Sequence, residues 1–205
     1  MFSQWTSDWE KRFQDGDVPW EEELPSTGMQ LLFSEYVSPG ARVLEVGCGF
    51  GTNAAWLAQN GYTVDAIDLS PTAIETANRR FDHISKSRLR FQTIDFCKEA
   101  ISGDYDAVFD KGVFHSFKTA RSHRPFAECV FRALKPGGYW INISGSTDNP
   151  DPVGSREAMG LPRVSMDDLH AASKDLFEIH EIRKSQFGIK NDFLTWEVVF
   201  KKPFN

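Results

Sequence analysis

The chain has 205 residues, of which 40% are apolar and 25% are charged, and its formal net charge at pH 7 is −6. This is the composition of an ordinary globular protein of one domain, and it excludes a disordered chain or a fibrous repeat. The acidic balance argues against a nucleic-acid partner, because proteins that bind phosphates usually carry a basic face.

The three cysteines, Cys48, Cys97 and Cys129, lie far apart and lack metal-ligand spacing. Such a sparse, odd set predicts reduced thiols and no metal site. The first twelve residues lack the apolar stretch of a signal peptide, and no segment has the about 20 apolar residues that span a bilayer. We therefore expect a cytoplasmic monomer or homodimer without a membrane partner.

Alternating strands and helices begin after the first 40 residues. Each predicted strand is a short apolar run, and the helices are bounded by capping residues and glycine turns. Such alternation favours a parallel sheet with right-handed crossovers. The first elements are a strand at 43–46, a glycine turn at 47–51, a helix at 52–59, a strand at 62–67, and a helix from Pro71 to Phe81 capped by Ser70.

The alternation continues to the end of the chain. Its last two strands have no helix between them, which predicts an antiparallel hairpin at the edge of the sheet. The elements are strands at 88–93 and 106–109, a helix at 125–134, a turn at 135–138, a strand at 139–143, a loop at 145–163, a helix from a Ser165 cap to Leu176, and strands at 177–182 and 193–200.

A candidate ligand site lies where the first two strands end, because open α/β sheets bind ligands at the carboxyl ends of their strands. Glycines at 47, 49 and 51 let the backbone approach a ligand closely. Asp68 follows the first glycine by about 20 residues, the distance at which a carboxylate accepts hydrogen bonds from ribose hydroxyls. Glu45 would repel a pyrophosphate, yet it suits a cofactor that carries an ammonium and a sulfonium. A nucleoside-containing cofactor is expected.

Residues 43–51 together with Asp68 resemble the first two motifs of the class I S-adenosylmethionine-dependent methyltransferases. Residues 94–96 are similar to the acid of that family's third strand, and 134–138 to the turn before its fifth strand. The resemblance implies S-adenosylmethionine as cofactor, a single domain over residues 1–205, and an α/β Rossmann-like fold. That fold is a seven-stranded, mostly parallel sheet with helices on both faces and a late antiparallel hairpin. The implied cofactor-binding residues are Glu45, Gly47, Cys48, Gly49, Gly51, Asp68, Leu69, Asp95, Phe96 and Asp110.

The flanking segments resemble the thiopurine S-methyltransferase-like and tellurite-resistance-type branch of that family. This resemblance implies that residues 1–40 form an N-terminal helical and aromatic lid, in which Trp9 and Trp20 bind the cofactor. It also implies a basic residue after the fourth-strand aspartate, where Lys111 replaces the more usual arginine. The matching residues are Trp5, Trp9, Val18-Pro19-Trp20, Asp110-Lys111-Gly112 and Gly160-Leu161-Pro162.

Two residues after the fourth strand are candidate catalytic groups, His115 and Lys111. A thiol acceptor needs little help with its proton, whereas a hydroxyl needs a positioned base, and the ordinary pKa of histidine suits that role. The motifs of nucleic-acid methyltransferases are missing after the fourth strand. The loop at 145–163 and Phe114 predict a small, ring-lined pocket. We expect a small-molecule acceptor, first a thiol or similar nucleophile, then a phenol or carboxylate.

Several alternatives stay open from the sequence. In the simplest interpretation, Trp20 packs in a core, Asp95 caps a helix, and His115 has a structural role. For the whole chain, the alternatives are a protein methyltransferase, a non-catalytic nucleoside-cofactor-binding module, and an NAD-type oxidoreductase, which the glycine spacing and Glu45 disfavour.

Overall fold

The computed structural model describes residues 3–101, 103–117, 120–148, 163–187 and 193–204. The predicted loop at 145–163 and the Gly160-Leu161-Pro162 motif lie largely or wholly outside these residues. The chain divides into two compact units, Met1–Ile101 and Ser102–Asn205. No helix in the described part of the chain is long and apolar enough to cross a bilayer.

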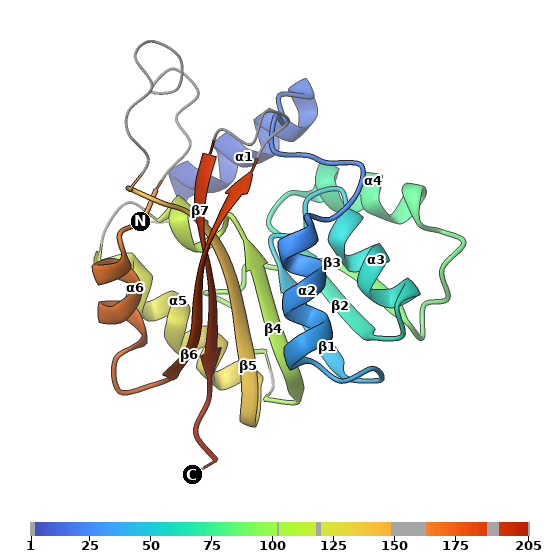
Figure 1. Cartoon of the computed structure of the whole chain (residues 1–205). Coiled ribbons are helices and arrows are strands. Elements are labelled where there is room, and N and C mark those ends of the chain that lie inside the picture. The colour runs from blue at the N-terminus through green and yellow to red at the C-terminus, as the bar shows by residue number, and fades with distance from the viewer. Residues whose placement is uncertain (1–2, 102, 118–119, 149–162, 188–192, 205) are drawn as a thin grey trace. The chain divides into compact units, whose positions relative to one another are not determined.

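The first unit contains three parallel strands and four helices among its described residues (Figure 1). The strand and helix predicted around Ser70 and Pro71 are confirmed: the Ser70 hydroxyl accepts a hydrogen bond from the Ala73 N–H, and proline occupies the first turn. The elements are α1 (Ser3–Asp15), α2 (Thr27–Tyr36), β1 (Arg42–Val46), α3 (Thr52–Gln59), β2 (Thr63–Asp68), α4 (Pro71–Arg80) and β3 (Leu89–Thr93).

A buried carboxylate joins the three strands of this unit. Asp65 on β2 is 3% exposed. It accepts hydrogen bonds from Arg42 on β1 at 2.9 Å and from Arg90 on β3 at 2.7 Å. Because both arginines pair with the one central strand, this ion-pair network stabilises the order in which the strands lie.

Helix α2 belongs to the core of the first unit. Its Met29, Leu32 and Phe33 are fully buried. The Tyr62 hydroxyl donates to the carbonyl oxygens of Phe33 and Val37 at the end of this helix. Residues 1–40, which the sequence predicts to form a lid, therefore include a helix of the core. The residues before α2 are the part of this segment for which the lid stays a prediction.

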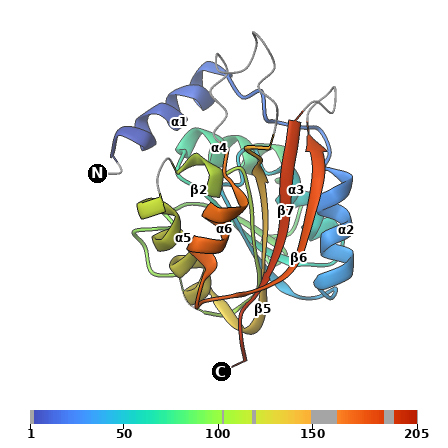
Figure 2. The same cartoon turned by 60° about the vertical axis from the view of Figure 1, so that its left-hand side comes forward.

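The second unit contains β4 to β7 and the helices that follow β4 and β5 (Figure 2). Strands β4 and β5 are parallel, whereas β7 is antiparallel to both β5 and β6, so the late antiparallel pair is confirmed. The elements are β4 (Tyr105–Lys111), η1 (Phe114–Ser116), α5 (Ala120–Ala133), β5 (Leu134–Gly145), α6 (Met166–Ser173), β6 (Glu178–Phe187) and β7 (Phe193–Lys201).

All seven strands belong to one sheet in the order β3-β2-β1-β4-β5-β7-β6. This mostly parallel, mixed sheet is the Rossmann-like fold that the sequence predicted. In such a sheet the ends of β1, β2, β4 and β5 are the positions at which ligands bind.

Two element boundaries differ from the sequence predictions for local reasons. Helix α5 begins at Ala120, so Pro125 lies inside it rather than at its first turn. Helix α6 has the predicted capping box of Ser165 and Asp168 but ends at Ser173. It does not reach Leu176 because the backbone leaves the helical region at Lys174, which has a ψ of 135°, and Asp175 follows with a left-handed φ of 61°.

The predicted turn at 135–138 lies inside β5, at an irregularity. The register with β4 jumps there from Leu134 to Tyr139. Gly137 has a φ of 77°, and its N–H donates to the Lys202 carbonyl at 3.0 Å. The positive φ favours glycine at this position, and a Cβ here would also collide with the exposed Phe204 ring.

Candidate active site

The glycine turn after β1 folds back over the end of β2. The N–H groups of Gly47 and Cys48 both donate to the Ile67 carbonyl, at 2.8 and 3.0 Å. Gly49 and Gly51 have φ values of 52° and 83°, which side chains rarely tolerate. A Cβ on Gly51 would lie 2.6 Å from the buried Phe91 ring, so this glycine is fixed by core packing. Gly49 instead faces a polar group described below.

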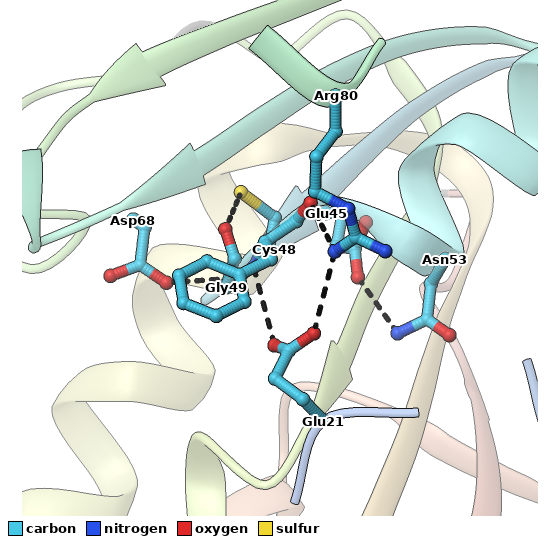
Figure 3. Close-up of polar contacts among 8 residues, drawn as sticks. Glu21, Glu45, Cys48, Gly49, Asn53, Asp68 and Arg80 are labelled. Atoms are coloured by element: carbon cyan, nitrogen blue, oxygen red, sulfur yellow. Dashed lines mark hydrogen bonds and ion pairs between the residues drawn. The ribbon is translucent and has the colours of Figure 1, made fainter. Parts of the chain in front are cut away.

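Asp68 connects the glycine turn to the start of α4, and Figure 3 shows its contact with Gly49. One carboxylate oxygen accepts the Gly49 N–H and the other accepts the Ser70 N–H, both at 2.9 Å. The side chain is buried, and this burial raises its pKa above the ordinary value. Asp68 thus lies at the predicted position, where it shapes the turn. Its contact with a ribose stays a prediction.

Glu45 and Cys48 lie buried beside the same turn. The Glu45 Oε1 accepts a hydrogen bond from the Asn53 amide at 3.2 Å, which orients the carboxylate toward the start of α3. Burial, together with the charges of Asp68 and Glu45, raises the pKa of the Cys48 thiol well above its usual range. Cys48 is therefore a protonated packing residue and not a nucleophile.

The first residue of α3 carries a polar group with which a ligand can form a hydrogen bond. The Thr52 Oγ1 is buried, and no group in the described part of the chain bonds to it. A buried hydroxyl without a partner is costly, so it indicates a position that a ligand or water completes. Together with the acidic groups and the three glycines of the turn, it fits a cofactor with a cationic end.

Glu21 lies against the glycine turn, a position that the sequence did not predict. Its Oε1 accepts the Phe50 N–H at 3.2 Å, and its Oε2 lies 3.8 Å from the Arg80 guanidinium. Figure 3 shows the Glu21 and Arg80 side chains pointing toward one another. A Cβ on Gly49 would lie 2.5 Å from this carboxylate. The only signal in the sequence is its place directly after Trp20, because the acidic run at 21–23 otherwise resembles a solvated surface.

The N-terminal aromatic residues form a cluster on this turn. The rings of Trp9 and Trp20 lie 5.3 Å apart, and the Arg12 guanidinium stacks 4.3 Å from the Trp20 ring. Phe13 contacts both Trp20 and Phe50, the latter within the glycine turn. The structure therefore brings Trp9 and Trp20 together near the predicted cofactor residues. A direct cofactor contact by either ring stays a prediction.

The residues that follow β2 and β3 have local partners. Leu69 is half-buried directly after Asp68, and Phe96 is buried. The Asp95 carboxylate pairs with Lys98 at 2.6 Å and accepts the Cys97 N–H at 3.3 Å. Asp95 therefore caps a turn and not the helix of the alternative interpretation, and its role toward an adenine stays a prediction.

In the second unit, Asp110 organises the turn after β4. Its buried carboxylate accepts hydrogen bonds from the Trp140 indole at 2.8 Å, the Asn142 amide at 3.0 Å and the Phe114 N–H at 3.0 Å. Burial raises the pKa of Asp110 to about 6. With this many protein donors, Asp110 acts as a positioning residue, and Lys111 next to it is the half-buried last residue of β4.

His115 lies in η1 and is held by the end of β5. Its Nδ1 accepts the Gly145 N–H at 2.7 Å. Burial lowers the pKa of the ring to about 4, so the imidazole is neutral at physiological pH. Among the described residues, no cluster of three or more His, Cys, Asp or Glu side chains is placed to hold a metal ion.

The comparisons with known proteins agree with this arrangement. A family model described as a methyltransferase domain matches residues 43–138. "Probable thiol methyltransferase 2" of Arabidopsis thaliana is 29% identical over 137 residues, which is 66% of this chain and 60% of that relative's length. The chain thus spans less than two thirds of this curated relative.

Two solved structures are similar over nearly the whole chain. One, described as "Conversion of a Disulfide Bond into a Thioacetal Group during Echinomycin Biosynthesis", has 25% identity and a TM-score of 0.75, covering 91% of this chain and 85% of the other. A TehB-like S-adenosylmethionine-dependent methyltransferase from Corynebacterium glutamicum has 22% identity and a TM-score of 0.66, covering 98% and 99%.

These matches agree with the family resemblance seen in the motifs and with the predicted fold. Residues 43–138 are a methyltransferase domain, which agrees with the class I S-adenosylmethionine-dependent family that the motifs predicted.

Proposed function

We propose that this protein transfers a methyl group from S-adenosylmethionine to a small-molecule nucleophile, with sulfur acceptors preferred over phenols and carboxylates. The observation that carries the proposal is the glycine turn that Asp68 holds by the Gly49 N–H at 2.9 Å. This turn, in a chain whose family match begins at residue 43, supports a cofactor site at the ends of β1 and β2.

The charges around the turn suit a cationic cofactor. Glu45 and Asp68 are buried carboxylates on successive strands, and Glu21 adds a third from the N-terminal segment. When bound, S-adenosylmethionine supplies an electrophilic methyl group on a positively charged sulfur. In this proposal Asp68 holds the ribose, Thr52 donates one hydrogen bond, and Glu45 attracts the ammonium.

Two relatives support sulfur as the acceptor atom. The Arabidopsis relative is described as a thiol methyltransferase, and the structure with 25% identity concerns the conversion of a disulfide into a thioacetal. Methyl transfer to sulfur requires alignment and exclusion of water more than proton removal, since a thiolate is already a strong nucleophile. The described part of the chain has a neutral histidine after β4, which agrees with that requirement.

The test is a panel of thiols, selenols, phenols, carboxylates and amines, assayed for formation of S-adenosylhomocysteine. We expect turnover with thiols first. Binding of S-adenosylmethionine without turnover for any acceptor would favour a non-catalytic module. Methyl labelling of a protein in a cell extract, with no small acceptor methylated, would favour a protein methyltransferase.

A further inference from the structure

His115 has a fixed orientation and a fixed tautomer. The Gly145 N–H points at Nδ1 over 2.7 Å, and a backbone amide can only donate. Nδ1 must therefore carry the lone pair. In a neutral imidazole the proton is then on Nε2. The alternative ring orientation would place a carbon against the amide and leave the Gly145 N–H without an acceptor.

The backbone around the ring is fixed at three points. The Phe114 N–H donates to Asp110, the Ser116 hydroxyl donates to the Gly112 carbonyl at 2.6 Å, and the Gly112 N–H donates to the Ile143 carbonyl at 2.9 Å. These bonds connect η1 to the ends of both β4 and β5. The imidazole is therefore preorganised and does not depend on a ligand for its orientation.

The Nε2–H group is the part of the ring that is left for a ligand. Among the described residues, none accepts a hydrogen bond from it. A Cβ on residue 112 would lie 3.3 Å from Nε2, so Gly112, with a φ of 86°, leaves this side of the nitrogen uncovered. The ring lies at the carboxyl ends of two parallel strands, the edge at which open α/β sheets bind ligands.

We propose that His115 is a hydrogen-bond donor to an anionic acceptor and not the base that deprotonates it. Nε2 already carries a proton, and the only lone pair of the ring is occupied by Gly145. The preferred substrates are therefore nucleophiles that ionise by themselves near neutral pH, thiolates above all. This inference rests on the proposed function and narrows its substrate class.

The step balances without a protein base. The acceptor loses its proton to solvent, and the thiolate enters as an anion next to Nε2–H. A lone pair on its sulfur forms the new bond to the methyl carbon. The bond from that carbon to the sulfonium breaks, and its electron pair stays on the departing sulfur. An anion and a cation thus become a neutral thioether and a neutral leaving group.

The test separates the two ring nitrogens by substitution. His115→Gln can present an amide N–H near the position of Nε2, whereas His115→Asn supplies an acceptor for the Gly145 N–H and no donor at Nε2. His115→Ala removes both. The readout is kcat/KM with S-adenosylmethionine saturating and an aryl thiol, an alkyl thiol or a phenol as acceptor.

For the aryl thiol, which is ionised at neutral pH, we expect His115→Gln to stay within about fivefold of wild type. His115→Asn and His115→Ala should both fall by about 10- to 100-fold, the usual range for a lost hydrogen bond to a charged group. A base would give the opposite pattern: all three variants would lose about 10²- to 10⁴-fold with the phenol and little with the aryl thiol.

Nitrogen-15 NMR of the imidazole provides a readout besides activity. We expect Nε2 to stay protonated and Nδ1 unprotonated from pH 6 to pH 9, and the reverse tautomer would overturn the inference. If wild type is active and His115→Gln is as slow as His115→Ala, the inference fails while the proposed function stands. If wild type methylates no small acceptor, the proposed function itself is contradicted, and the inference with it.

Discussion

Glu10 on α1 and Thr72 on α4 are joined by a hydrogen bond of 2.6 Å, although 62 residues separate them in the sequence. The same carboxylate accepts a hydrogen bond from the Ser70 hydroxyl at the N-cap of α4. A carboxylate at a helix N-terminus is favoured by the helix dipole and by unpaired N–H groups. Glu10 therefore anchors the N-terminal helix on the element that follows Asp68, as the contact of α1 with α4 in Figure 2 shows.

We predict that Glu10→Gln weakens the docking of α1. Backbone amides of α1 should exchange with solvent faster, and the affinity for S-adenosylmethionine should fall severalfold because Trp9 and Phe13 lose their fixed positions. Glu75→Gln, an exposed acid on the same helix α4, is the matched control and should change neither property. Equal exchange rates in Glu10→Gln and wild type would contradict the anchoring role.

We predict that acid weakens the docking of α1. Burial of Glu10 opposes its charge, but hydrogen bonds from Ser70 and Thr72 dominate and lower its pKa below the ordinary value of 4.5. A lowered pKa in the docked state means that docking is strongest above pH 4.5 and is lost as the pH falls through the lowered value. The protection factors of the α1 amides, which are corrected for the intrinsic pH dependence of exchange, should therefore fall in acid in wild type, and the change should be smaller in Glu10→Gln.

We predict that two buried aspartates on β2 have separable roles. Asp68→Asn places an amide N–H against one of two backbone donors, Gly49 or Ser70, and should weaken cofactor binding by about 10- to 100-fold. Asp65→Asn, three residues earlier, breaks the pairs with Arg42 and Arg90 instead. It should lower the free energy of unfolding by about 1–3 kcal/mol and leave cofactor affinity unchanged. Calorimetric titration and denaturant unfolding measure the two effects. Identical affinities in folded Asp68→Asn and wild type would exclude the cofactor role.

Most of the site around the glycine turn was predictable from the sequence, because the residues that signal it are close together in the chain. The apolar run before Gly47, the turn, the Ser70 cap and the position of Asp68 are all set by neighbours in the sequence. Glu21, Glu10 and the tautomer of His115 were not predictable. Each depends on a partner brought close by the fold, respectively Phe50, Thr72 and Gly145. The core position of α2 was also missed, since its burial depends on partners such as Tyr62, which lies beyond β1.

Gly49 and Gly51 should respond differently to substitution by alanine. Both have positive φ values, so each substitution should cost about 1–2 kcal/mol of backbone strain. At Gly49 the additional clash is with the flexible end of Glu21, whereas at Gly51 it is with the buried Phe91 ring. Glu21→Ala should therefore restore part of the unfolding free energy that Gly49→Ala loses. The effects of Glu21→Ala and Gly51→Ala on the unfolding free energy should instead be additive within about 0.5 kcal/mol. Unfolding free energies of the single and double variants give both couplings, and equal couplings would contradict the placement of Glu21.

Asp110 should make stability fall as the pH rises. Its pKa is raised from 3.8 to about 6 in the folded chain, so the unfolded chain ionises this group first. Between about pH 4 and pH 6 the contribution of this residue to the free energy of unfolding should fall by about 3 kcal/mol. The difference in unfolding free energy between wild type and Asp110→Asn isolates this contribution. A difference that does not change over this pH range would contradict the raised pKa.

The most direct test of the central claim is transfer of an isotopically labelled methyl group from S-adenosylmethionine to a small aryl thiol, with both products measured by mass spectrometry. We predict one labelled thioether for each S-adenosylhomocysteine formed, a rate that falls about 10- to 100-fold in Asp68→Asn at low cofactor concentration, and no labelled protein. Bound S-adenosylmethionine that yields neither product with any small nucleophile would contradict the claim.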